Sequence, residues 1–454
     1  MPGREMTPAD LSRRTMLGLC AAGVASTALA QHAPAATPAH SGRAFPKGFL
    51  WGSATAGHQV EGNNVASDMW LLEHVKPTLF AEPSADACDS LSRWAEDLDL
   101  LKALGLNAYR FSLEWSRIEP EPGRFSIAML DHYARLIDGC LTRGLRPIVT
   151  FSHFSVPRWL AARGHFQGPD GADLFARFCE RATQALGDRI AYAVTLNEPN
   201  VSALLRFIAL PAMFMPAVQA MLGAAGKASG STGFASALFS DRDITGEMVA
   251  AHIKGFQAIK AIRPALPVGV GLAVEDDQLV GTDDGYRAAK RKAVYAPWFD
   301  VTRTHGDFIG VQNYTRRRYD GHGLVPPPAG APLASDGREI YPASLANSVR
   351  YAHAETGKPV LITENGVAAH DDTVRQRYIP EALGGLHDAI AEAVPVIGYI
   401  HWSLLDNFEW VSGYAQQFGL ATVDRKTFRR ALKPSALDYG RIARGNRLPL
   451  SSRS

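Results

Sequence analysis

The stretch PVLITENG at residues 359–366 indicates the fold of this 454-residue chain. Three apolar, β-prone residues follow a proline and lead directly into the polar corner Thr363-Glu364-Asn365-Gly366. This is the pattern of a buried parallel strand with a carboxylate at its C-terminal end, and Asn-Gly predicts a sharp turn just beyond it. The stretch alone equally fits a strand end whose acid caps a neighbouring group. A catalytic role for Glu364 therefore requires a second carboxylate elsewhere in the chain.

The same unit, a short β-prone run, a polar turn and an amphipathic helical stretch, repeats along the chain. Eight such alternations predict an α/β protein with a single-domain (β/α)8 TIM barrel. A doubly wound sheet is disfavoured, because no glycine-rich phosphate turn follows the first strand. The predicted strands are residues 49–55, 108–114, 147–151, 191–196, 268–274, 308–314, 360–364 and 396–402.

Polar side chains should gather where the strands of such a barrel end. The fourth strand ends in Asn197-Glu198-Pro199, and strands four and seven can place their ends across one mouth. A helix cap is the alternative role for Glu198. Paired carboxylates in a barrel mouth suggest glycoside hydrolysis, in which one group acts as acid and base and the other stays ionised. The polar residues at the predicted strand ends are Gln59, Arg110, His153, Glu198, Asn313, Glu364 and Trp402.

Five groups of motifs together resemble glycoside hydrolase family 1, the β-glucosidase family of retaining enzymes. The resemblance covers nearly all of the chain that follows the N-terminal segment, and its motifs are specific in combination. They are FLWGSAT at 49–55 with QVEG at 59–62, YRFS at 109–112 with Trp115 and Arg117, TLNEP at 195–199, ITENG at 362–366, and HWSLLDNFEW at 401–410.

The resemblance implies that Glu198 is the acid/base and Glu364 the nucleophile. It also implies catalytic support from Arg110, Tyr314 and Asn313, with the first two beside Glu364 to hold it ionised. The residues that it implies for sugar binding are Gln59, His153, Asn197, Trp402, Glu409 and Trp410.

Some positions bear on the substrate. Glu409 supplies a carboxylate for sugar hydroxyls and disfavours a 6-phosphate, which requires cationic partners. Phe154 and Gln417 stand where the family usually has tryptophan and arginine. Residues 203–222 replace a Gly- and Pro-marked loop with an apolar, Met-rich segment, which is either a helix on the barrel exterior or a wall over the aglycone site.

We therefore expect a retaining exo-β-glycosidase of the β-glucosidase type, which hydrolyses terminal non-phosphorylated β-D-glycosides with a hydrophobic or aryl aglycone. The alternatives are a β-galactosidase or β-fucosidase, a transglycosidase on the same scaffold, and a catalytically silent glycoside-binding protein. No cofactor and no metal site are expected, because no Cys/His spacing resembles one. A net charge of +2 gives no indication of nucleic acid, and no apolar run predicts an integral membrane span. The oligomeric state stays open.

The N-terminus predicts export. Residues 1–30 read as a twin-arginine-type signal peptide, with SRRTML at 12–17, an apolar run and Ala-Leu-Ala at 28–30. The protein is then expected to be periplasmic or secreted. Residues 31–43 are predicted as a linker, 44–446 as the barrel glycosidase domain and 447–454 as a C-terminal tail. The odd number of cysteines left after cleavage, Cys88, Cys140 and Cys179, predicts no disulfide framework.

Overall fold

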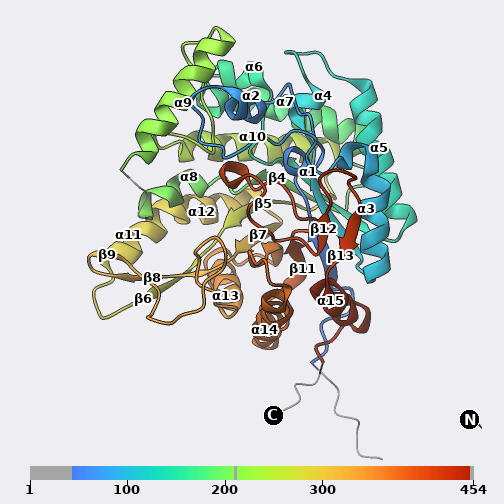
Figure 1. Ribbon diagram of the computed structural model, residues 1–454, viewed down its shortest axis with the longest axis vertical. Coiled ribbons are helices and arrows are strands. Elements are labelled where there is room, and N and C mark those ends of the chain that lie inside the picture. The colour runs from blue at the N-terminus through green and yellow to red at the C-terminus, as the bar shows by residue number, and fades with distance from the viewer. Residues whose placement is uncertain (1–42, 209–211, 450–454) are drawn as a thin grey trace, which may run out of the picture. The chain divides into compact units, whose positions relative to one another are not determined.

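The computed structural model describes residues 43–208 and 212–449 (Figure 1). Eight parallel strands close into a barrel in the order β1-β11-β10-β7-β5-β4-β3-β2, which confirms the predicted (β/α)8 fold. Each predicted strand overlaps one barrel strand, and the ends differ by at most two residues. The barrel strands are β1 Leu50–Ala54, β2 Ala108–Ser112, β3 Arg146–Ser152, β4 Tyr192–Asn197, β5 Val268–Ala273, β7 Phe308–Asn313, β10 Val360–Asn365 and β11 Val396–Trp402.

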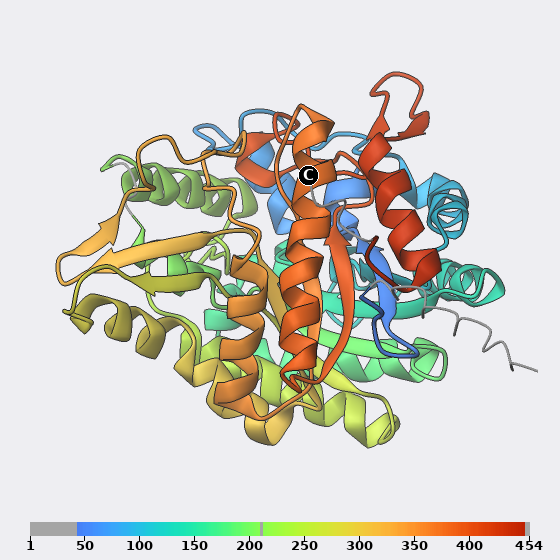
Figure 2. The same cartoon turned by 90° about the horizontal axis from the view of Figure 1, so that it is seen from below.

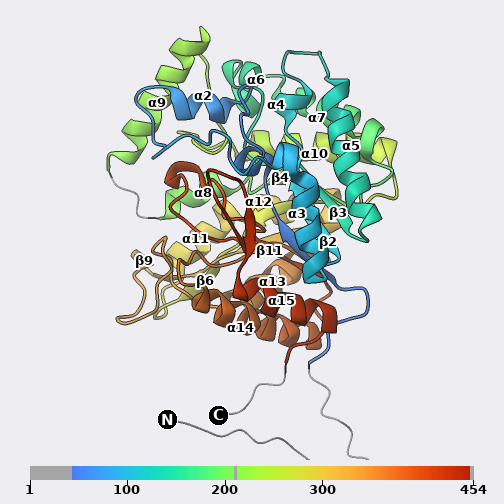
Figure 3. The same ribbon diagram turned by 45° about the vertical axis from the view of Figure 1, so that its right-hand side comes forward.

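One long helix follows each barrel strand and packs outside it. In α7 the buried residues Phe175, Phe178, Cys179, Ala182 and Leu186 form the single apolar stripe that a helix needs to pack on a sheet. Figure 2 shows α13, α14 and α15 side by side, and α3 packs against α5 in Figure 3. These helices are α3 Ser90–Leu104, α5 Ile127–Thr142, α7 Gly171–Leu186, α10 Thr245–Ile262, α12 Ala296–His305, α13 Ser344–Thr356, α14 Asp372–Ala391 and α15 Pro434–Gly445.

The strands alternate between two cores, as the two-residue period of a strand requires. One cluster fills the barrel interior, and the other lies between the barrel and the helices. Strand β5 contributes glycine to the interior: a Cβ on Gly269 would lie 2.7 Å from the ring of Phe308, so that ring fills the space instead. The inward-facing residues of the other seven strands are Leu50, Ala108, Ile148, Val194, Phe308, Leu361 and Ile400.

Strand β10 breaks this alternation before it ends. Leu361 faces the interior, so regular alternation would turn Glu364 toward the helices. A register shift against β7 lies between Ile362 and Glu364. Beyond it, Glu364 faces the barrel mouth, whereas the Asn365 amide donates to the hydroxyl of Tyr378 on α14. This bulge therefore aims the carboxylate.

The loops at the strand ends contain further structure. A three-stranded sheet of β6 Asp276–Leu279, β8 Arg316–Asp320 and β9 Gly323–Val325 lies beside the barrel, and β12 Ala421–Val423 pairs with β13 Arg430–Leu432. The remaining helices are α1 Gly57–Val60, α2 Asp68–His74, α4 Trp115–Ile118, α6 Arg158–Ala162, η1 His165–Gln167, α8 Val201–Leu204, η2 Leu205–Phe207, α9 Phe214–Ser229, α11 Gly285–Val294 and η3 Trp410–Ser412.

The apolar segment 203–222 divides between two places. Its first part belongs to α8 and η2, and its second part belongs to α9, which lies beside α2 on the outside of the fold (Figures 1 and 3). The sulfur of Met221 on α9 accepts hydrogen bonds from the Thr78 hydroxyl at 3.8 Å and the Leu79 N–H at 3.5 Å. The exterior-helix reading therefore describes α9.

The predicted signal peptide, all but the last residue of the linker, and the end of the tail lie outside the described residues. Within 43–208 and 212–449, no helix is long and apolar enough to cross a membrane. The same residues contain no group of three or more His, Cys, Asp or Glu side chains arranged to hold a metal ion. Cys88, Cys140 and Cys179 are buried and free.

Candidate active site

A cavity of about 300 Å³ opens at the C-terminal ends of the barrel strands, where the predicted carboxylates meet. Arg110 lies beneath the lining and donates a hydrogen bond to Glu364, one of the lining residues. Asn313 is not among the lining residues. The other residues predicted for the site all line the cavity: Gln59, His153, Asn197, Glu198, Tyr314, Glu364, Trp402, Glu409 and Trp410.

Glu364 is held by a cation and a phenol. The Arg110 guanidinium donates to Oε1 of Glu364 at 2.5 Å, and the Tyr314 hydroxyl donates to Oε2 at 2.5 Å. Arg110 also donates to the Asn197 side-chain oxygen at 2.6 Å and to the Thr150 hydroxyl at 3.1 Å, which fixes the plane of its guanidinium. Both oxygens of Glu364 thus have charged or polar donors at short distance.

Among residues 43–208 and 212–449, no side chain donates a hydrogen bond to the carboxyl group of Glu198 in this way. Glu198 follows the end of β4 with φ at 42°, in the left-handed region, and its N–H donates to the Gly271 carbonyl at 2.7 Å. Burial and the nearby negative charge of Glu364 raise the pKa of Glu198 to about 8, although Arg338 and Arg110 partly oppose the shift. At neutral pH Glu198 is therefore mainly the protonated acid.

The two carboxyl groups ionise in a fixed order. Burial raises the pKa of Glu364 as well, but the charge of Arg110 and the hydrogen bonds from Tyr314 and Arg110 pull it back. Glu364 consequently loses its proton first, and its charge then holds the proton on Glu198. One ionised and one protonated carboxyl group face the same cavity, which is the division of roles that glycoside hydrolysis needs.

Several polar atoms of the lining residues are buried without a partner in the described part of the chain. They are Gln59 Oε1, His153 Nδ1 and Gln312 Oε1. Burial and the charge of Arg110 lower the pKa of His153 well below its ordinary value, so its imidazole is neutral. A buried polar atom without a partner is costly unless a ligand satisfies it, and a sugar hydroxyl can do so.

The aromatic side of the cavity is built from stacked rings. The Trp402 indole N–H donates to Oε1 of Glu409 at 3.2 Å, and the ring of His153 stacks on Trp402 with 5.7 Å between centroids. Trp410 stacks on His58, with 5.7 Å between centroids and an interplanar angle of 5°. These contacts hold both indoles at the edge of the polar cavity, and apolar ring faces beside hydroxyl partners suit a sugar.

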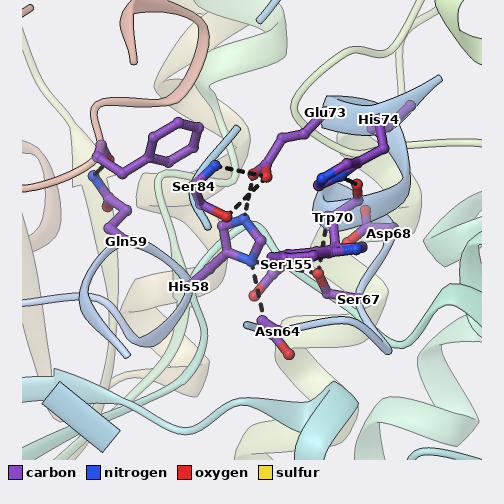
Figure 4. A network of polar contacts seen from close by, with 12 residues as sticks. His58, Gln59, Asn64, Ser67, Asp68, Trp70, Glu73, His74, Ser84 and Ser155 are labelled. Carbon is purple, nitrogen blue, oxygen red and sulfur yellow. Dashed lines mark hydrogen bonds and ion pairs between the residues drawn. The ribbon is translucent and has the colours of Figure 1, made fainter. Parts of the chain in front are cut away.

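A buried polar network holds His58 (Figure 4), and Trp410 stacks on this ring. Nε2 of His58 lies 2.7 Å from Oε1 of Glu73, and Nδ1 lies 3.2 Å from the Asn64 amide. The other oxygen of Glu73 accepts from the N–H and hydroxyl of Ser84. Burial lowers the pKa of His58, but the hydrogen bond and charge of Glu73 together with the charges of Glu114 and Asp68 outweigh burial, so the net shift is upward. No local sequence pattern indicated this support, because its residues lie in loops and short helices.

The prediction that Asn313 supports the catalytic residues needs correction. Its amide donates to the carbonyls of Val274 and Thr315 and to Ser348, and its side-chain oxygen accepts from Ser344. Both serines belong to α13, so Asn313 faces the helices.

The preceding residue on β7, Gln312, faces the cavity and donates to the Asn197 side-chain oxygen at 2.7 Å. Neighbours on a strand point to opposite faces, and the sequence motif did not show which of the two faces inward.

The outer half of the cavity combines apolar and charged side chains. Phe154 packs its ring edge-on against Trp410, with 5.4 Å between centroids. Met213, Phe214 and Met215 are not among the residues that line the cavity. The apolar lining residues of the 201–238 segment are Val201, Leu204, Ile208 and Leu238, and the charged outer ones are Glu275, Arg317 and Arg338. No sequence motif indicated these three charged residues, because they lie beyond the ends of the barrel strands.

Comparison with known proteins agrees with this geometry. The sequence profile described as Glycosyl hydrolase family 1 matches residues 41–318 and 301–448. Beta-glucosidase A of Thermotoga maritima is 32% identical over 449 residues, which cover 89% of this chain and 98% of the relative. A beta-glucosidase of an Agrobacterium species is 31% identical, with 88% of this chain and 95% of the relative covered.

A solved structure described as the apo structure of a beta-glucosidase 1317 superposes with a TM-score of 0.85 at 42% identity, and covers 87% of this chain and 98% of its own. The match therefore extends over the barrel and the cavity alike. This chain belongs to glycosyl hydrolase family 1 and is an O-glycosyl hydrolase.

Proposed function

We propose that the protein is a retaining exo-β-glucosidase that acts on terminal, non-phosphorylated β-D-glucosides with a hydrophobic or aryl aglycone. The observation that supports it most directly is that one cavity holds both Glu198, whose pKa is raised to about 8, and Glu364, whose two carboxylate oxygens accept from Arg110 and Tyr314. The relatives named beta-glucosidases support glucose as the sugar.

The first step breaks the glycosidic bond. A carboxylate oxygen of Glu364 attacks the anomeric carbon while Glu198 transfers its proton to the leaving oxygen, which departs with the aglycone. Arg110 and Tyr314 keep Glu364 ionised until it attacks. Asn197, oriented by Arg110 and Gln312, is positioned for the 2-hydroxyl, whose hydrogen bonds strengthen as positive charge develops on the sugar.

The second step releases the sugar. Once the proton has left, Glu198 is a carboxylate and takes a proton from a water molecule, whose oxygen attacks the anomeric carbon. The bond between that carbon and Glu364 breaks, and its electron pair returns to the Glu364 carboxylate. Two displacements at one carbon give net retention of configuration. Glu198 regains its proton and the cycle closes.

The lining supports both parts of the substrate. Near Gln59 and Trp402, the acid group of Glu409 offers oxygen acceptors but no positive charge for a 6-phosphate. Val201, Leu204 and Ile208 give the outer half an apolar wall that suits an aryl group better than a second sugar.

The test is hydrolysis of 4-nitrophenyl β-D-glucopyranoside, with the anomer of the released glucose followed by proton NMR. The β-anomer is expected first, and initial formation of α-glucose would contradict the retaining mechanism. The 4-nitrophenyl galactoside and fucoside, measured alongside, decide the sugar. Glu364→Gln should abolish turnover, and a fully active E364Q would refute the assignment of the nucleophile.

We also propose export through the twin-arginine motif of residues 12–17. Paired arginines before an apolar run and an Ala-Leu-Ala site support it. Replacement of Arg13 and Arg14 by lysine should retain the protein in the cytoplasm of its host, measured by cell fractionation and immunoblot. Unchanged export of the double variant would contradict the proposal.

A further inference from the structure

We propose that the outer half of the cavity recognises an aromatic aglycone that bears a carboxylate, with Arg338 and Arg317 as its cationic partners. This inference rests on the proposed β-glucosidase function and specifies the substrate class of the same site. Both arginines line the cavity together with the apolar residues Val201, Leu204 and Leu238.

Arg338 is fixed next to the catalytic centre with part of its guanidinium free. Asp336 accepts from its Nε at 2.7 Å and also pairs with Nη2. The guanidinium carbon lies 4.8 Å from the ring centroid of Tyr314, the phenol that donates to Glu364. Nη1 has no partner among residues 43–208 and 212–449, and 30% of the side chain is exposed. One N–H edge of Arg338 is therefore available to a ligand.

Arg317 offers a second free edge. Its Nε donates to Oε1 of Glu275 at 2.9 Å, and its two terminal nitrogens have no partner in the described chain. Oε2 of Glu275 accepts from Lys290 at 2.7 Å, and Lys290 is completely buried. Glu275 is therefore shared by two cations, and Asp336 pairs with Arg338. Both lining arginines keep free N–H edges, although each has a carboxylate partner.

The chemistry of this half selects an acid on a flat, apolar group. A guanidinium presents N–H donors in a planar fork that matches a carboxylate, and such charge-assisted hydrogen bonds are stronger than those to a neutral hydroxyl. Val201, Leu204 and Leu238 provide few partners for the hydroxyls of a sugar aglycone. Arg338 also lowers the pKa of Glu198, but that effect requires only its charge and not a free N–H edge.

The test compares 4-carboxyphenyl β-D-glucopyranoside with its methyl ester. The rings are the same, and the ester is the better leaving group, so a preference for the acid must come from binding. For the wild type we expect kcat/KM to be about tenfold higher for the acid, as one charge-assisted hydrogen bond implies. The acid-to-ester ratio should fall in R338Q and R317Q, be partly retained in R338K, and be unchanged in R318Q. Arg318 is the matched control, since it lies next to Arg317 on strand β8 but does not line the cavity.

Each outcome has a distinct meaning. Equal rates on acid and ester in the wild type, or an unchanged ratio in both R338Q and R317Q, would overturn the inference while leaving the β-glucosidase assignment intact. Failure to hydrolyse the neutral ester and phenyl β-D-glucoside would instead refute the proposed function. A β-glucosyl glucuronate that is hydrolysed better than the aromatic acid would overturn the aromatic part. The ratio cancels any general effect of a variant on folding or on the chemical step.

Discussion

Replacement of Tyr314 by phenylalanine removes one hydroxyl group from the site. That hydroxyl donates to Oε2 of Glu364 at 2.5 Å, whereas Arg110 still holds Oε1. The bond favours the ionised form of Glu364, so its loss should raise the pKa of the nucleophile. The enzyme then needs a higher pH before Glu364 can attack, and the acidic limb of the rate profile should move upward.

The size of the shift follows from the strength of the bond. A hydrogen bond to a charged group contributes about 1.5–3 kcal/mol, and one pKa unit corresponds to about 1.4 kcal/mol. The acidic limb of kcat/KM should therefore rise by about one to two pH units. In the plateau region, kcat/KM should fall by about 10- to 100-fold and no more, because Arg110 still holds the other oxygen of Glu364.

The assay is kcat/KM for phenyl β-D-glucopyranoside as a function of pH. Tyr439→Phe is the matched control, since the Tyr439 hydroxyl is also buried but, within the described part of the chain, donates only to the backbone carbonyls of Gly52 and Tyr399. Its acidic limb should stay in place even if the variant is less stable. An acidic limb that is unmoved or lowered in Y314F, or that moves equally in Y439F, would refute the argument.

Four further outcomes are expected. Glu198→Gln should lower kcat/KM for phenyl β-glucoside by about 100- to 10,000-fold, but much less for the 2,4-dinitrophenyl glucoside, whose leaving group needs no proton; equal losses would contradict its role as the acid. Arg338→Gln should move the alkaline limb of kcat/KM upward from about pH 8, because the lost positive charge no longer favours ionised Glu198; a downward shift would contradict this. Gly366→Ala should lower the free energy of unfolding by about 1–3 kcal/mol in urea denaturation, because its Cβ would lie 2.1 Å from the Trp402 carbonyl oxygen. His58→Phe should lower it by about 3–5 kcal/mol in the same measurement, since a buried carboxylate loses its partner; an unchanged urea midpoint would contradict either stability prediction.

The barrel and its two glutamates could be predicted from the sequence because both depend on local patterns. Apolar runs of strand length ending in polar corners define the strands, and the corners at Glu198 and Glu364 are themselves the ends of β4 and β10. The carboxylates then meet because all eight strands of a closed parallel barrel end at one mouth.

What the sequence could not predict depends on register and on long loops. Whether Gln312 or Asn313 faces inward is decided by the pairing of β7 with its neighbours, which no local pattern records. Arg338 lies in the long loop between β9 and α13, so its approach to Tyr314 is a tertiary contact between residues far apart in sequence. The division of the apolar segment between the cavity wall and the exterior helix α9 likewise depends on where the chain turns.

The bulge in β10 has a consequence for how this site can change. Glu364 faces Arg110 because of how many residues separate it from Leu361 on β10. The types of those residues alone would not place it there. Deletion of Thr363 would place Glu364 two residues after Leu361 instead of three, so its carboxylate would start one residue deeper in the barrel and withdraw from Tyr314, although the barrel hydrogen bonds could still form. Insertions and deletions in related chains should consequently avoid 361–364 and collect in the loops, where the aglycone side of the cavity is built. Substrate range can then diversify while the position of the nucleophile stays constant.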